Sequence, residues 1–235
     1  LPNDPANKEV GALQGKWIWA ESATQPGGPA AGEKVVFRKK FSIQGEVTRS
    51  SGVITCDNSY TLWINGNKVG EDGNWENIEL FEPSKFLVQG ENEIVALGGN
   101  GGNGPNPAAL YIEMLVETEK GISRVATSTE WEVATGTPDN QGKLSGDQVK
   151  WRPATEAAGP WGGRLNGELQ QSLSRGLSVG NKMARASLMK GDFLMRSLGR
   201  PNRDQVVTVR PTELTQLEAM DLSNGQTLAD WLKQG

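Results

Sequence analysis

Short strand-like runs separated by turn residues fill the first two-thirds of the chain, and this pattern most restricts its possible folds. The runs are Val35–Phe41, Ser51–Cys56, Tyr60–Ile64, Glu93–Leu97 and Ala109–Glu117. Asn65-Gly66 follows one of them and is the typical sequence of a type I′ hairpin turn. With 30 Gly and 12 Pro among 235 residues, the pattern predicts a mainly β fold, namely a jelly-roll β-sandwich.

The pattern changes beyond residue 163, where leucines recur at every fourth position. Leu169, Leu173 and Leu177 predict a helix, and further helical stretches are expected within 183–235. The chain therefore divides into a sandwich, residues 1–163, and a short, mostly helical C-terminal extension, residues 164–235. The helices are short, so we expect them to pack on the sandwich, on a partner or on the rest of a longer protein. Deleting 164–235 is expected to leave a folded sandwich.

The absence of histidine excludes several kinds of site. Neither a Ser-His-Asp nor a Cys-His catalytic site is possible, and no histidine is present to bind zinc or haem. Cys56 is the single cysteine, which excludes an internal disulfide. A net charge of −4 and the lack of a basic stripe laced with aromatics argue against nucleic acid as a partner. No apolar run is long enough to predict a membrane span.

The order and spacing of several motifs resemble the galactose-binding-domain-like β-sandwich, an accessory module of glycosidases that include α-L-rhamnosidases. The motifs are Gly15–Trp19, Phe37–Phe41, Asp57–Gly70, Gly90–Ala96 and the Gly-, Asn- and Pro-rich segment before Ala108–Leu110. The resemblance implies a non-catalytic carbohydrate-binding module of a larger exported protein, in the periplasm or outside the cell. The chain begins at Leu1 without a methionine, and we expect it to be processed or part of a longer protein.

A second resemblance concerns the C-terminal residues. Leu198–Thr208 and Thr215–Gly225 resemble the ends of large planctomycete proteins with cytochrome-c-like domains and no established function. The same tail is basic between Arg164 and Arg210, which predicts either docking, with the Arg200–Arg203 turn as its main element, or a solvated helix surface.

Sugar binding needs an aromatic face together with amides and carboxylates held in place. The predicted carbohydrate-binding residues are Asp57, Asn58, Trp75, Asn100, Asn103, Asn106 and Tyr111. Trp17, Trp19 and Trp63 are instead predicted to fill the core. Trp75 lies in a polar stretch, where a ligand contact and burial are both open.

Asp57-Asn58 has three interpretations. The pair can cap a turn, ligate a hard cation such as calcium, or bind a sugar hydroxyl directly. In some rhamnosidase modules of the resembled family, calcium and an Asp-Asn pair hold the sugar together, although no complete calcium-loop motif occurs here. Gly98–Pro107 lacks the Lys-Ser/Thr ending of a phosphate loop and is interpreted as a crossover loop at a binding end of the sandwich.

Two other functions remain open. The sandwich could be a structural or docking module without a ligand of its own. A glycosidase would need two carboxylates about 5–10 Å apart in a cleft, and the sequence singles out no such pair.

Overall fold

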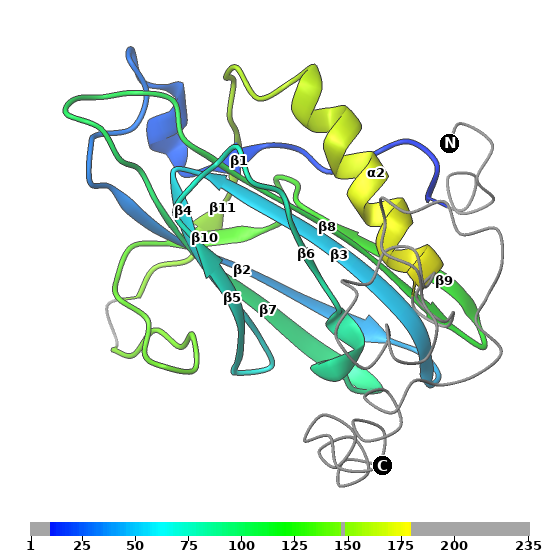
Figure 1. Cartoon of the computed structure of the whole chain (residues 1–235). Helices are drawn as coiled ribbons and strands as arrows, with labels where there is room; N and C mark the ends of the chain where they lie inside the picture. Colours follow the sequence, from blue (N-terminus) through cyan, green and yellow to red (C-terminus); the bar gives the residue numbers. More distant parts are fainter. Residues whose placement is uncertain (1–9, 147–148, 180–235) are drawn as a thin grey trace, which may run out of the picture. The chain divides into compact units, whose positions relative to one another are not determined.

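A computed structural model describes residues 10–146 and 149–179, and it contains two antiparallel sheets stacked face to face (Figure 1). The first sheet has the order β12-β1-β8-β3-β6, with β9 also paired to β8. Its strands are β1 (Ile18–Trp19), β3 (Val47–Asp57), β6 (Glu79–Phe81), β8 (Ala109–Thr118), β9 (Gly121–Ala126) and β12 (Thr155–Glu156). This arrangement confirms the predicted mainly β sandwich.

The second sheet has the order β11-β10-β2-β7-β4-β5. Its strands are β2 (Lys34–Ile43), β4 (Ser59–Ile64), β5 (Asn67–Asp72), β7 (Gly90–Gly99), β10 (Glu132–Ala134) and β11 (Arg152–Pro153). Two short 3₁₀ helices, η1 (Glu21–Thr24) and η2 (Pro83–Lys85), lie in the connections. The turn between β4 and β5 is the predicted type I′ hairpin, because Asn65 and Gly66 have φ angles of 51° and 78°.

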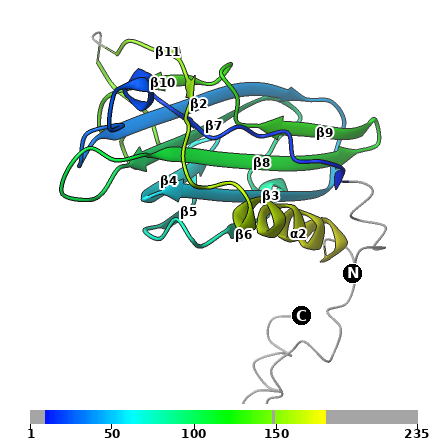
Figure 2. The ribbon, with the colours of Figure 1, turned by 90° about the horizontal axis from the view of Figure 1, so that it is seen from above.

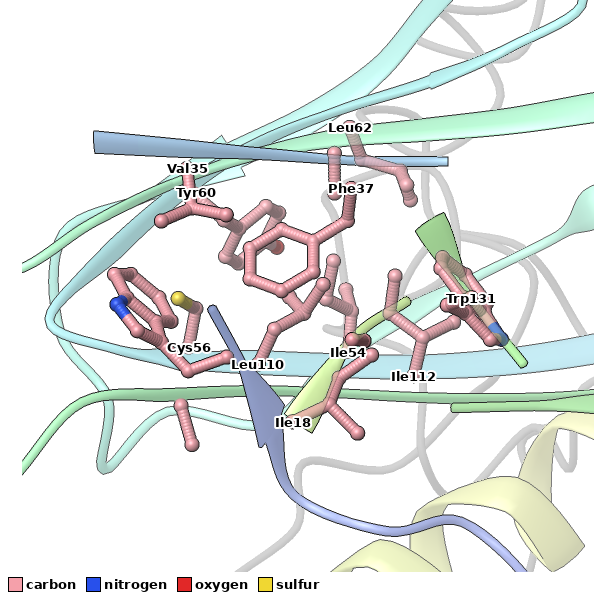
Figure 3. Packing of buried hydrophobic residues seen from close by; sticks show 14 of the residues in the cluster. Ile18, Val35, Phe37, Ile54, Cys56, Tyr60, Leu62, Leu110, Ile112 and Trp131 are labelled. Carbon is pink, nitrogen blue, oxygen red and sulfur yellow. The ribbon is translucent and has the colours of Figure 1, made fainter. Parts of the chain in front are cut away.

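The core fills the space between the sheets with aromatic and branched side chains (Figure 3). Trp19 is fully buried there, and its ring centroid lies 5.4 Å from that of Phe37. Trp63 is also buried, but it packs with Val36 and Val95 on the opposite face of the second sheet. Its indole Nε1 donates to the carbonyl of Asn140, and Leu144 and Trp151 pack on the same cluster, so these residues cover that face. The predicted place in the core between the sheets is therefore confirmed for Trp19, whereas Trp63 is buried outside that core.

Helix α2 (Arg164–Val179) covers part of the outer face of the first sheet, where it runs beside β3 (Figure 2). Its buried leucines are Leu165, Leu169, Leu173 and Leu177. The last three pack on Val53 and Leu115 of the sheet. The predicted helix is confirmed, and it belongs to the same compact unit as the sheets.

The boundary at residue 163 thus separates the sheets from a helix that packs on them, and independent folding of 1–163 stays a prediction. The other predicted helices, the Arg200–Arg203 turn and the planctomycete-like segments lie outside the described residues. No helix in the described part of the chain is long and apolar enough to span a bilayer.

Candidate functional site

Asp57 lies at the end of β3, on the rim of the sandwich where the 98–107 loop also runs. It is buried, and Oδ2 of its carboxylate accepts a 2.9 Å hydrogen bond from Nε1 of Trp161. Burial raises the pKa of Asp57 from its ordinary value of 3.8, and the bond from Trp161 opposes that rise. The peptide bond between Asp57 and Asn58 is cis. One oxygen of this carboxylate is therefore committed to holding Trp161 in place.

The asparagines predicted to bind a ligand mostly hold the 98–107 loop together. Oδ1 of Asn58 accepts the N–H of Gly101. Nδ2 of Asn100 donates to the carbonyls of Pro29 and Ala30, both at 3.0 Å. Nδ2 of Asn106 donates at 2.9 Å to the carbonyls of two glycines in its own loop. These three carboxamides fix a Gly-rich loop that would otherwise be costly to order.

Two polar groups of the loop take no part in its internal hydrogen bonds. Asn103 is exposed on the loop. Asn100 is only 3% exposed, and its Oδ1 has no hydrogen-bond partner among the described residues. Buried acceptors are normally satisfied, so this unpaired oxygen is an exception, and Asn100 lines none of the hollows described below. The loop therefore offers one exposed carboxamide, that of Asn103.

An aromatic cluster occupies the outer face of the first sheet. The rings of Trp17 and Trp161 stack with centroids 5.1 Å apart, and the ring of Tyr111 tilts against Trp17 at 5.3 Å. Trp161 and Tyr111 are buried, whereas Trp17 is half-buried. Of the predicted core tryptophans, Trp17 thus keeps an accessible edge. Tyr111, predicted to bind a sugar, lies in this cluster and is separated from the 98–107 loop.

A buried carboxylate fixes this cluster to the N-terminal segment. Oε2 of Glu113 accepts a 2.6 Å hydrogen bond from the hydroxyl of Tyr111, and burial together with Glu113 raises the pKa of that hydroxyl. The same oxygen accepts the backbone N–H groups of Gln14 and Gly15. Arg124 pairs with the other carboxylate oxygen. The charge of Glu113 is therefore compensated, as a buried carboxylate requires.

Two hollows meet at Ala157–Ala158 on this rim. The aromatic pocket has a volume of about 430 Å³ and is lined by Trp17, Tyr111, Trp161, Lys16, Glu156 and Asn166, among others. The loop recess has a volume of about 320 Å³ and is lined by Gly28, Pro29 and Pro107, among others. Ala157 and Ala158 line both. No sequence motif predicts that the two hollows adjoin, because their walls come from segments far apart in the chain.

A third hollow of about 540 Å³ lies on the outer face of the second sheet. Lys34, Thr61, Glu71, Leu97 and Gly99 line it, among others. Tyr60 is the aromatic residue among the described residues that border it, and Tyr60 is buried.

Trp75 borders none of these three hollows. It is half-buried and packs against the core between the sheets. Its carbonyl accepts a 2.8 Å hydrogen bond from Oγ1 of Thr55 in β3. Trp75 thus packs partly on the core, and its contact with a ligand stays a prediction. Among residues 10–146 and 149–179, no three acidic, cysteine or histidine side chains group in a way that could hold a metal ion.

No family model matches the chain. An α-L-rhamnosidase of Streptomyces avermitilis is 23% identical over 166 residues, which cover 66% of this chain and 16% of that enzyme. This chain thus corresponds to a small part of its relative's length.

Solved structures show the same fold. The crystal structure of Streptomyces avermitilis α-L-rhamnosidase complexed with L-rhamnose matches 63% of this chain and 15% of that one, with a TM-score of 0.55 and 22% identity. The lectin from Pleurotus ostreatus in complex with GalNAc matches 60% of this chain and 42% of that one, with a TM-score of 0.51 and 21% identity. The first resemblance drawn from the sequence is thereby confirmed, and the second stays a prediction. The described sandwich has the galactose-binding-like fold of these α-L-rhamnosidase and lectin domains.

Proposed function

We propose that the chain is a non-catalytic carbohydrate-binding module of a larger protein. The observation that carries the proposal is the rim of the galactose-binding-like sandwich, where the 98–107 loop and the aromatic cluster surround two adjoining hollows. One similar structure holds L-rhamnose and another holds GalNAc, which supports a sugar as the ligand class. The chain matches only 15% of the rhamnosidase structure, which supports an accessory module over an enzyme.

The rim supplies both kinds of contact that a sugar needs. The accessible part of Trp17 offers an apolar surface, and the exposed side chain of Asn103 offers a polar contact for hydroxyl groups. Asn58 and Asn106 act indirectly in this proposal, because their carboxamides hold the loop in shape. A shallow surface of this kind gives modest affinity at a single site.

Calcium is a further part of the proposal. Hard cations prefer carboxylate and amide oxygens, and Asp57 is a carboxylate at this rim. Asp57 would hold the cation through the oxygen that does not bind Trp161, and Asn58 would need to release Gly101 to contribute its own. When bound, calcium would supply a positive charge that attracts hydroxyl oxygens of the sugar. The raised pKa of Asp57 implies that protons compete with the cation at acid pH.

The proposal is tested by a glycan-array screen and by thermal shift, each with calcium and with chelator. Where the screen finds a glycan that binds, Asn103→Ala should weaken that binding. This exposed side chain takes no part in the loop's own hydrogen bonds, so its loss leaves the loop intact. The matched control is Asn140→Ala, another exposed asparagine, in the segment that covers the second sheet. A folded protein that binds none of the printed glycans would contradict the proposal and favour a docking module. Binding unchanged by chelator would contradict only the calcium part.

A further inference from the structure

The two hollows on the rim share a wall. Ala157 and Ala158 border both the loop recess and the aromatic pocket. Ala157 is fixed by a 2.8 Å hydrogen bond from its N–H to the carbonyl of Trp17. Ala158 is exposed, and its single methyl group leaves a low ridge between the two spaces. A ligand larger than one recess can therefore cross from one to the other.

The aromatic pocket has the chemistry of a subsite for a neutral ring. Its wall is the half-buried Trp17, and its rim carries Lys16, Glu156 and the exposed carboxamide of Asn166. Lys16 and Glu156 lie 3.5 Å apart and are each 57% exposed, so their charges offset each other while their polar atoms remain accessible. An apolar wall with polar groups of both signs suits a pyranose ring more than an anion.

The loop recess is bordered by small and apolar residues. Gly28, Pro29 and Pro107 form much of its wall, and no charged side chain borders it. Gly28 has a φ of 86°, and a Cβ there would lie 2.8 Å from the carbonyl carbon of Asn106. This glycine thus permits the close approach of the two loops that shapes the recess. The neutral wall agrees with the neutral character of the aromatic pocket.

Both hollows are held open by buried polar bonds. Asp57 holds Trp161, Glu113 holds Tyr111 and the segment before Trp17, and Asn100 holds Pro29. A site whose walls are already fixed loses less entropy when a ligand binds. Each hollow is within the usual size range of ligand pockets, about 300–1,000 Å³.

We infer that the loop recess and the aromatic pocket are two subsites of one surface that binds a neutral oligosaccharide of at least two rings across Ala157–Ala158. This inference rests on the proposed function for the class of ligand. It adds that the ligand is a chain and that Trp17, Glu156 and Asn166 contact a ring which the 98–107 loop does not reach.

The test compares ligand lengths on the whole chain. A glycan array of neutral mono-, di- and tetrasaccharides supplies the best oligosaccharide and the monosaccharide of the same terminal ring, and both are then titrated by calorimetry. We expect the oligosaccharide to bind at least tenfold more tightly. Ala158→Phe should abolish this gain, because a large ring on the wall that the two hollows share blocks the crossing. Asn166→Ala should reduce the gain several-fold.

Ser145→Phe is the control for added bulk, since Ser145 is exposed and borders neither hollow. Equal affinities for the two ligands, or an Ala158→Phe variant that behaves like Ser145→Phe, would overturn the two-subsite inference alone. Failure of the folded protein to bind any printed glycan would overturn the proposed function and this inference with it. Thermal unfolding of each variant distinguishes a blocked surface from a misfolded one.

Discussion

Gly176→Ala should destabilise the protein, although alanine normally stabilises a helix interior relative to glycine. Gly176 lies in α2, where the helix approaches β3. A Cβ at this position would overlap Oγ of Ser51 and lie 2.8 Å from Cδ1 of Leu80 and 2.9 Å from the Cβ of Ser51. Ser51 is buried, and its hydroxyl donates a 2.9 Å hydrogen bond to the carbonyl of Leu173. The added methyl group must therefore displace either the helix or this bond.

The magnitude follows from opposing effects. Overpacking a tight contact costs about 1–3 kcal/mol, and loss of the Ser51 hydrogen bond adds about 1 kcal/mol. The helix preference for alanine returns about 1 kcal/mol. We expect a net destabilisation of about 1–3 kcal/mol. Gly167 is the internal control, because it lies in the same helix and no atom is within 4 Å of its ideal Cβ. Gly167→Ala should therefore stabilise the protein by about 0.5–1 kcal/mol.

Urea unfolding of the whole chain, followed by far-ultraviolet circular dichroism, measures both free energies of unfolding. The two variants should shift the midpoint in opposite directions without changing the slope. If Gly176→Ala stabilised the protein as much as Gly167→Ala, the close packing of α2 on β3 would be refuted. Ser51→Ala, alone and combined with Gly176→Ala, completes a double-mutant cycle. A coupling free energy of about 0.5–3 kcal/mol is expected for two residues in contact.

Four further predictions concern the buried polar groups and α2. Because the pKa of Asp57 is raised in the folded state, the folded protein binds this proton more tightly, and the contribution of Asp57 to stability falls as pH rises above 3.8. Asp57→Asn should flatten that part of the melting temperature's dependence on pH. An unchanged profile would refute the pKa shift. Trp161→Phe removes the donor to Asp57 and should cost about 1–3 kcal/mol in urea unfolding at pH 7, with a smaller cost at pH 3; equal costs at both values would count against the assigned bond. Arg124→Met leaves Glu113 buried without its charge partner and should cost about 3–5 kcal/mol, whereas a near-zero cost would show that the pair is not buried. Leu173→Ala, at a fully buried position of α2, should cost about 2–5 kcal/mol, and a cost below about 0.5 kcal/mol, typical of surface positions, would show that the helix does not pack there.

Local patterns predicted much of the fold. The hairpin followed from Asn65-Gly66 because its backbone angles are set by the two residues of the turn. The helix followed from leucines four residues apart because this spacing places them on one helix face. The position of Trp63 on the outer face did not follow, because Asn140 and Leu144, which cover it, are distant in the chain. The alternation of side chains along a strand indicates which residues share a face of the sheet, but it does not show which segment covers that face.

The candidate site was harder to predict because its contacts are not local. Asp57 and Trp161 are separated by 104 positions, and no short motif links them. The asparagines of the Gly-rich loop were predicted to bind a sugar, but carboxamides that order a loop have the same chemistry as carboxamides that bind a sugar. Only the donors and acceptors around Asn100 and Asn106 distinguish the two roles. Gly159 and Pro160 beside Trp161 are typical of a turn, but they do not show which carboxylate the indole of Trp161 reaches.

The structure also decides which variants can locate a ligand. Loss of binding in Asp57→Ala would have two causes, because that variant removes a candidate ligand group and releases Trp161 from the wall of the aromatic pocket. Asn58→Ala has the same defect, since its carboxamide holds the 98–107 loop. Asn103 and Asn166 are exposed on the two sides of the rim. Their alanine variants remove no buried bond, so a loss of glycan affinity in either one would identify the surface that a bound sugar touches.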